Sequence, residues 1–418
     1  MKEIKPGYKE TPIGILPRDW DVKRLGELLE FKNGINASKE QYGSGIKFIN
    51  VLDILNNEYI TFDKVVGKVN INQETLDKYD VNYGDILFQR SSETREEVGT
   101  ASVYLDNNPN VTFGGFVIRG KKISDYFPIF LNKVLKNSAV RNQITSKAGG
   151  STRYNVSQEI LEGVLIPIPP KEEQEKIAQI LMTWDEAIEK QEELIEQEKE
   201  FKKGMMQKIF SQKLRFKDEN GNDYSEWEEK KLGETISFIV DNRGKTPPFQ
   251  ENGIPLIEVN SIGKKKIDYN IIKKYVSEEV YNNWFRKYLK KNDILFSTVG
   301  ATGLCSIYDE TIKSIIAQNI VGLRFEFQNH IFIFYLLTFE ENNVKFKKIQ
   351  MGAVQPSLKV TQMTEIKFLF PPLPEQEKIA NFLSTIDEKI EVLEKKLEEL
   401  KEQKKGLMQK LLTGEVRV

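Results

Sequence analysis

The sequence of 418 residues has very little of the chemistry on which metal and thiol sites depend. It contains one cysteine, Cys305, and one histidine, His330, which excludes a disulfide framework, a multi-cysteine zinc site and a two-histidine metal motif. The longest apolar run, residues 331–339, has nine residues, whereas a membrane-spanning helix needs roughly 20. The N-terminal MKEIKPGYKE has no apolar signal region, so we expect a cytoplasmic protein with no membrane partner.

Catalytic motifs are equally scarce. No GxxxxGK[ST] loop is present, which excludes the common ATPase phosphate loop. The TPPF segment at 246–249 is similar to an amino-methyltransferase loop. However, Thr246 replaces the polar residue that grips the amine, and no Gly-x-Gly segment for the methyl donor stands upstream. Cys305 and His330 are interpreted as packing or surface residues, with a nucleophile–base pair as a remote alternative. The residues therefore predict no enzyme and no metal site.

The sequence contains an internal duplication with a long period, which indicates two tandem domains rather than a solenoid of short repeats. Matching segments lie 202 to 208 residues apart, among them the Trp20 and Trp227 regions and the two DILF segments at 85–88 and 293–296. The segments 173–208 and 375–410 share 22 of 36 residues without a gap. We predict a first domain at 1–170, a first long helix at 171–210, a second domain at 211–370, and a second helix with its tail at 371–418.

The two bodies are predicted to be α+β. Short apolar runs bounded by Gly and Asn, such as VNYGDILFQR and GIPLIEVNSIG, are typical of strands. FPIFLNKVLKNSAVRNQI has apolar residues at 3–4 spacing, which predicts helix. The bodies carry net charges of +1 and +3 and the tails −4 and −1, a distribution that permits nucleic-acid binding without requiring it.

Each tail is predicted to be one long helix of a coiled coil. A proline segment precedes each of them and ends at Pro170 and Pro374, which permits a helix to begin downstream. Apolar residues then recur at 4–3 spacing with charged flanks, the pattern of a heptad seam. The predicted seam residues are Ile177, Leu181, Trp184, Ile188, Ile195, Ile379, Leu383, Ile386, Ile390, Leu393, Leu397 and Leu400.

The two helices have matching registers, so each could bury the apolar stripe of the other. Two body-and-helix copies related by an approximate two-fold axis would pair their helices antiparallel. Pairing between two chains is the alternative; we favour pairing within one chain because the effective concentration is high.

Polar loops with matching positions in both repeats are candidates for DNA contact. Arg can recognise guanine, Asn or Gln can recognise adenine, and Ser or Thr can contact several bases. The alternative is that these are ordinary polar surface loops. The candidates are Arg90, Ser91, Ser92, Arg95, Lys147, Ser151, Thr152, Arg153, Tyr154, Arg243, Lys245, Ser297, Thr298, Gln350, Gln355, Ser357 and Lys359.

The whole chain resembles the DNA-specificity subunits of type I restriction-modification systems. The resemblance rests on LPRDWDVKRLGE and SEWEEKKLGE at the start of each body, NRGKTPP at 242–248, the repeated DILF, PPKEEQEKIA and PLPEQEKIA, and the terminal KKGLMQKLLTGEV. The first body departs from the pattern, since FKNGINASKEQ stands where the second body has RGKTPP.

The resemblance implies a non-catalytic subunit with two target recognition domains, each of which recognises half of a bipartite site in double-stranded DNA. The helices would set the distance between half-sites and dock two modification (methyltransferase) subunits. Those partners would bind S-adenosylmethionine, and a restriction subunit that translocates DNA would use ATP with magnesium; this subunit itself would hold no cofactor. Two alternatives remain: a coiled-coil scaffold without a nucleic-acid role, and a stand-alone nuclease or methyltransferase.

Overall fold

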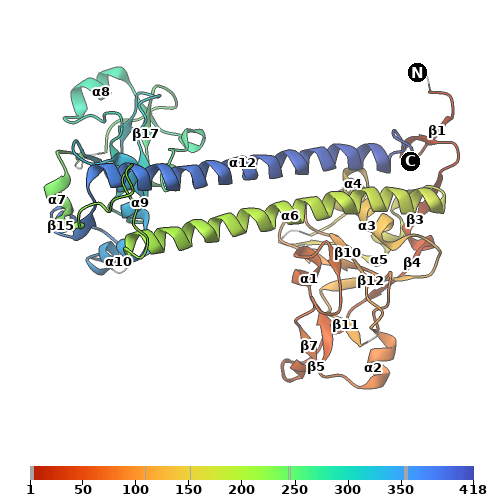
Figure 1. The fold of residues 1–418 in the computed structure, drawn as a ribbon. Coiled ribbons are helices and arrows are strands. Elements are labelled where there is room, and N and C mark those ends of the chain that lie inside the picture. The colour runs from red at the N-terminus through yellow and green to blue at the C-terminus, as the bar shows by residue number, and fades with distance from the viewer. Residues whose placement is uncertain (1–3, 109, 151, 243, 245, 353–355) are drawn as a thin grey trace. The chain divides into compact units, whose positions relative to one another are not determined.

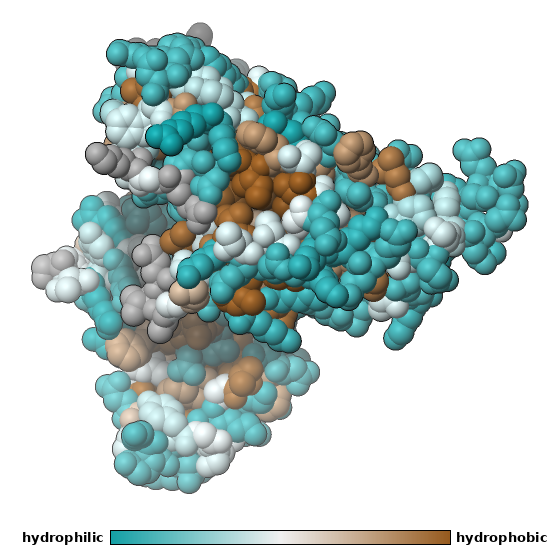
Figure 2. Space-filling model, turned by 90° about the vertical axis from the view of Figure 1, so that its left-hand side faces the viewer, coloured by the Kyte–Doolittle hydropathy of each residue, from teal (hydrophilic) through white to brown (hydrophobic). Residues whose placement is uncertain are grey.

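The computed structural model describes residues 4–108, 110–150, 152–242, 244, 246–352 and 356–418. The chain forms two compact units, one of Met1–Glu192 with Lys396–Val418 and the other of Glu193–Lys395. Each unit contains a body of strands and short helices together with part of both long helices (Figure 1). Hydrophilic residues cover most of the face drawn in Figure 2, and hydrophobic residues gather there in smaller patches. Within the described ranges, no helix combines the length and apolar character needed to cross a membrane.

The body of the first unit contains a five-stranded sheet of order β4-β12-β8-β10-β6 and a three-stranded sheet of order β11-β5-β7. These strands are β4 Leu29–Asn33, β5 Tyr42–Ile49, β6 Tyr59–Ile60, β7 Lys68–Val69, β8 Ile86–Gln89, β10 Ala101–Tyr104, β11 Val111–Phe113 and β12 Val117–Lys122. Three further pairs are β1 Tyr8–Thr11 with β2 Gly14–Pro17, β3 Asp21–Arg24 with β14 Leu165–Ile168, and β9 Ser91–Ser92 with β13 Tyr154–Asn155. The helices are η1 Leu25–Glu27, η2 Lys39–Gln41, α1 Val51–Leu55, α2 Gln73–Lys78, α3 Pro128–Lys136, α4 Ser138–Thr145 and α5 Gln158–Glu162.

Among the described residues, the body of the second unit has the same strand order without an equivalent of the edge strand β6: its sheets are β16-β22-β19-β20 and β18-β17-β21, and its pair is β15-β23. Its strands are β15 Glu228–Lys231, β16 Phe238–Val240, β17 Ile254–Ile257, β18 Tyr275–Val276, β19 Ile294–Ser297, β20 Cys305–Ile307, β21 Ile315–Ile316, β22 Ile320–Arg324 and β23 Lys367–Phe370. Its helices are α7 Leu232–Thr235, η3 Val259–Ser261, η4 Tyr269–Ile271, α8 Glu278–Trp284, α9 His330–Thr338, α10 Glu340–Lys348 and α11 Val360–Met363. The matching strand orders show that the internal repeat is a repeat of fold.

The DILF segments form the central strands β8 and β19. All three apolar residues of each strand are fully buried, as expected for a strand covered on both faces. The aspartate before each strand is buried as well: Asp85 accepts a hydrogen bond from the Lys122 backbone, and Asp293 forms two with the Arg324 guanidinium. Because each carboxylate has hydrogen-bond partners inside the body, these bonds fix the residue at which each central strand begins.

Each body is followed by one long helix, α6 Lys171–Phe210 and α12 Leu373–Leu412. α6 begins directly after Pro170, as predicted. The expectation for the second helix needs a correction, because Pro374 lies within the first turn of α12 rather than before it. The first turn tolerates proline because the backbone N–H groups there have no partner within the helix.

The two long helices pack antiparallel inside each unit. In the first unit, Lys404 pairs with Asp185, and Lys401 lies 2.8 Å from Glu192. In the second unit, Lys199 lies 2.6 Å from Glu394, and Lys202 lies 2.6 Å from Asp387. The pairing is therefore made within one chain. The predicted α+β fold of two bodies, each followed by a long helix that packs with the other, is confirmed.

The predicted seam residues are all withdrawn from solvent. Ile177, Leu181, Ile195, Ile379, Leu383, Ile386 and Ile390 are buried, and Trp184, Ile188, Leu393, Leu397 and Leu400 are partly buried. In each unit, the start of its own helix and the end of the other helix join the core of the body: Leu181 and Leu411 in the first unit, Leu383 and Ile209 in the second. Burial of both helix segments against the body stabilises the packing of each unit.

A buried glutamate anchors the start of each helix. Glu173 accepts a hydrogen bond from the Trp20 indole at 2.9 Å and two from Arg417 at 2.7 and 2.9 Å. Glu375 is held in the same way by Trp227 at 3.1 Å and by Arg215 at 2.8 and 2.9 Å. The repeated tryptophans therefore fix the direction in which each helix leaves its body.

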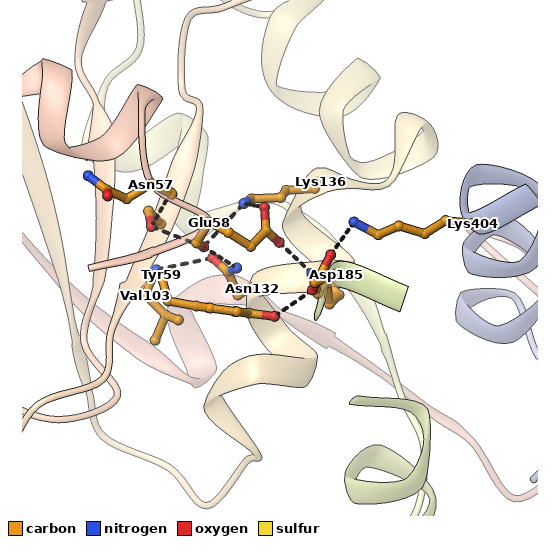
Figure 3. Close-up of polar contacts among 10 residues, drawn as sticks. Asn57, Glu58, Tyr59, Val103, Asn132, Lys136, Asp185 and Lys404 are labelled. Carbon is orange, nitrogen blue, oxygen red and sulfur yellow. Dashed lines mark hydrogen bonds and ion pairs between the residues drawn. The ribbon is translucent and has the colours of Figure 1, made fainter. Parts of the chain in front are cut away.

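A charged cluster joins the helices to the first body (Figure 3). Lys133 of α3 is almost completely buried and pairs with both Glu58 and Asp185. Lys136 lies 2.7 Å from Glu58, and the Tyr59 hydroxyl donates to Asp185 at 3.0 Å. Burial would raise the pKa of Glu58, but Lys136 and Lys133 together hold that pKa below its usual value. The cluster therefore contains ionised groups that stabilise one another.

Candidate nucleic-acid interface

The polar loops singled out in the first body meet at one edge. The chain leaves β8 at Gln89, passes Arg90, and forms β9, which pairs antiparallel with β13. Arg90 O accepts a hydrogen bond from Val156 N at 3.0 Å, and the Arg95 guanidinium lies 5.5 Å from the Tyr154 ring centre. Two loops that are about 60 residues apart in sequence thus form one surface, here named the first recognition edge (Arg90–Arg95 and Thr152–Asn155).

The second body builds an equivalent edge from the equivalent segments. Thr298 follows β19, and its backbone O accepts a hydrogen bond from Leu358 N at 2.8 Å. Val299 forms an isolated bridge with Ser357, and Met351 forms another with the same residue. We name this surface the second recognition edge (Thr298–Gly300 and Pro356–Lys359). The backbone pattern is shared by the two edges, whereas their side chains differ.

The predicted contact residues divide by exposure. Arg95, Lys147, Thr152, Arg153 and Lys359 are exposed, and Arg90, Ser91, Tyr154, Gln350 and Ser357 are partly exposed. Ser92, Ser297 and Thr298 are instead buried. Ser297 donates to Ala301 O at 2.6 Å, and Thr298 donates to Asn319 O at 3.3 Å. These three hydroxyl groups support the loops from inside, so their expected role as base contacts needs correction to a structural one.

Some candidates make contacts within the protein that orient them. Arg153 lies 3.8 Å from Glu93 at an exposed position, and the Gln350 side chain donates to Thr302. Arg90 donates to Gly115 O at 3.2 Å, which leaves the rest of its guanidinium available. The candidates Ser151, Arg243, Lys245 and Gln355 lie outside the described residues.

One turn beside each edge was not among the residues predicted from the sequence. It holds Phe116 in the first body and Gln318 with Asn319 in the second. Phe116 is 63% exposed, although it is a large apolar residue. The sequence signal for these turns was the match between GGFVIRG and AQNIVGLRF, which contain the start of the strands that pair with the two DILF strands.

Grooves lie between the long helices and the body in both units. One groove of about 270 Å³ in the first unit and one of about 290 Å³ in the second have matching helix residues. Lys401, Lys404, Lys405 and Met408 line the first; Lys199, Lys202, Lys203 and Met206 line the second. The body sides differ: Glu58, Lys133 and Lys136 in the first, and Thr338, Phe339, Glu340 and Glu341 in the second.

The rare reactive residues occupy packing positions. Cys305 is fully buried in β20, and burial raises the pKa of its thiol, so the thiolate that nucleophilic chemistry needs is disfavoured. His330 begins α9, where burial first and then the nearby lysines, Lys265 and Lys291, lower its pKa. Within the described part of the chain, no three metal-ligating side chains come together.

The duplicated body, the paired helices and the two polar edges define a class that comparison with known proteins identifies. The model of the family described as type I restriction modification DNA specificity domain matches residues 17–197 and again 224–402. The chain therefore belongs to the family of type I restriction-modification DNA specificity subunits, and the two matches coincide with the two repeats.

Two relatives match almost the whole chain, and a third matches about three quarters of it. A putative type I restriction enzyme MjaX specificity subunit from Methanocaldococcus jannaschii is 30% identical. The match covers 98% of this chain and 97% of that subunit. The MjaVIII specificity subunit of the same organism is 29% identical, with 98% and 96% covered. The EcoKI specificity subunit of Escherichia coli is 25% identical, with 74% and 67% covered.

Two solved structures share the fold. One comes from a study of complex assembly and conformational transition in a type I restriction-modification system; its TM-score is 0.62 at 17% identity, with 96% of this chain and 99% of that chain covered. The other is the type I S subunit of M. genitalium, with a TM-score of 0.52 at 19% identity and coverage of 94% and 96%. At these identities the likeness supports the fold.

Proposed function

We propose that each recognition edge contacts one half of a bipartite site in double-stranded DNA, and that the chain itself catalyses no reaction. The observation that carries the proposal is that one backbone arrangement is built twice and presents different side chains each time. A duplicated binding function predicts this combination, because the scaffold must be retained while the recognised bases change. The exposed arginines and lysines supply phosphate and guanine contacts, and the hydroxyl and amide groups supply contacts to other base edges.

The helices carry a second part of the proposal, the docking of two methyltransferase subunits. Some residues of the seam differ between the copies, since Trp184 corresponds to Ile386, and others are identical, such as Ile177 and Ile379. Several exposed residues are identical as well, among them Glu196 with Glu398 and Lys203 with Lys405. Folding alone would constrain the seam more strongly than the exposed surface.

The grooves show where this identity is concentrated. All four matching helix residues of the two grooves are the same in both repeats, whereas the body residues opposite them differ. A partner present in two copies explains why the same side chains are retained in each unit. We place S-adenosylmethionine in these methyltransferase subunits, and ATP with magnesium in a restriction subunit.

Exchange of one body tests the recognition proposal. Residues 1–170 would be replaced by the corresponding residues of a relative with a different site, and methylated sites would then be mapped in cells that contain the partner subunits. We expect one half-site to change completely and the other to stay the same. A change in both half-sites would contradict the assignment of one body to one half-site.

Charge reversal in the grooves tests the docking proposal. Lys203→Glu combined with Lys405→Glu should reduce co-purification of the methyltransferase subunit at least tenfold, because each groove loses an exposed cation. The control is Gln197→Glu, an exposed helix position that differs between the repeats: Gln197 corresponds to Glu399. Undiminished co-purification of the double variant would show that the grooves are not the docking surface.

A further inference from the structure

The turn between β11 and β12 in the first body has a counterpart between β21 and β22 in the second. Val117 N donates to Gly114 O at 2.8 Å, and Ile320 N donates to Ala317 O at 3.2 Å, so both turns are closed in the same way. They contain two central residues each: Gly115 and Phe116 in the first body, and Gln318 and Asn319 in the second.

Both turns are bonded directly to a recognition edge. Arg90 N donates to Phe116 O at 2.9 Å in the first body. Thr298 N donates to Asn319 O at the same distance of 2.9 Å in the second. The side chains of these turns therefore stand beside the loops proposed to contact DNA, and they do so at equivalent positions.

The first turn holds Phe116 in a fixed place. A side chain at Gly115 would lie 1.9 Å from the Asn36 amide oxygen, and one at Gly114 would lie 2.8 Å from the Phe48 ring. Gly114 N also donates to Ile49 O at 3.0 Å. Such close packing on both sides restricts the backbone of the turn, so the turn that carries the exposed ring has little backbone freedom to lose on binding.

The side chains of the two turns differ in chemistry, as expected if each turn contacts a different half-site. Phe116 is a 63% exposed apolar ring, and its backbone O accepts a hydrogen bond from the backbone N of the cationic Arg90. Gln318 is exposed and Asn319 is partly exposed. The Asn319 side-chain oxygen is buried and has no hydrogen-bond partner among the described residues, so this atom does not face a base edge.

We propose that this turn determines one base pair of each half-site, which extends the function proposed above and rests on it. Phe116 makes an apolar contact with a thymine methyl group in the first half-site. In the second half-site, the exposed amide of Gln318 hydrogen-bonds to an adenine edge. Apolar side chains and amides are the groups that make these contacts in the major groove.

Selection from randomised duplex DNA tests the turn, using the full chain in complex with its methyltransferase subunits. Phe116→Ala should lower the preference at one position of the first half-site by roughly 5- to 100-fold and leave the second half-site unchanged. The control is Phe327→Ala, which removes another exposed ring (78%) beyond the opposite end of the equivalent strand, β22. This control should keep the wild-type consensus at every position.

The second body supplies the reciprocal test. Gln318→Ala should relax one position of the second half-site only, and Phe116→Asn should change the preferred base in the first. An unchanged consensus for Phe116→Ala and for Gln318→Ala, with a bipartite consensus in the wild type, would overturn the role of the turn alone. Absence of any sequence preference in the wild-type complex would overturn the proposed function as well.

Discussion

Equivalent aspartates of the two long helices have different partners in the two units. Asp185 in the first unit and Asp387 in the second occupy equivalent positions, and each pairs with the equivalent lysine of the other helix, Lys404 or Lys202. The partners from the body are a buried ammonium group, Lys133, and the Tyr59 hydroxyl in the first unit, and a hydroxyl group alone, Tyr335, among the contacts described for the second. The charged helix residues are therefore the same in both units, whereas the body residues that contact the aspartate differ.

This difference sets how much each unit depends on its aspartate. The Lys133 side chain is 1% exposed and must remain paired, because an uncompensated buried charge is costly. Tyr335 is neutral, and Lys202 is partly exposed, so neither requires a carboxylate to the same degree. The same substitution should therefore have unequal effects in the two units.

The largest expected effect comes from Asp185→Asn, which leaves Lys133 with Glu58 as its one remaining carboxylate among the contacts described above. We expect the first unit to lose about 3 kcal/mol of stability and Asp387→Asn to cost the second unit about 1 kcal/mol. Hydrogen exchange measured separately on peptides of each unit checks this, since a chain of two units need not unfold in one step. Asp125→Asn at an exposed ion pair is the control. Equal losses in both units would show that the body partner does not matter.

A smaller contrast concerns the arginines that hold the buried glutamates. The Arg215 side chain is 20% exposed and Arg417 is 41% exposed, so water can replace the second more easily. We expect Arg215→Ala to destabilise the second unit by about 2 kcal/mol and Arg417→Ala to destabilise the first by about 1 kcal/mol. In both variants the tryptophan still donates to the glutamate. Hydrogen exchange in the first turn of each long helix, measured as the temperature is raised, ranks the two losses of stability. A larger loss for Arg417→Ala than for Arg215→Ala would contradict this expectation.

The sequence was sufficient for features that depend on local order along the chain. The prolines and the heptad pattern placed α6 at residues 171–210, as observed, because helix start signals and apolar spacing are local properties. Repeat matching also identified loops that the fold brings together, such as Ser91 with Asn155. Whether these loops contact DNA stays a prediction.

Features that depend on packing between distant segments could not be predicted. Ser297 and Thr298 have the composition of a contact loop, yet strand pairing and Asn319 enclose them. The pairing of Lys133 with Asp185 joins α3 to α6 and has no signature in either segment alone. Burial of a polar group is decided by what packs against it, and a single sequence does not state that.

The smallest expected effect concerns ion pairs that involve no residue of either body, so the two units should not differ there. Lys401 with Glu192 and Lys199 with Glu394 are equivalent pairs made entirely by the helices, at 2.8 and 2.6 Å. All four side chains are about half exposed, so each pair contributes little. We expect Lys401→Ala and Lys199→Ala to cost about 0.5 kcal/mol or less each, with equal losses that shrink as salt is added. Hydrogen exchange of the long helices at low and high salt measures both. If the two losses differed by more than about 1 kcal/mol, the bodies would have to influence even the contacts that the helices make with one another.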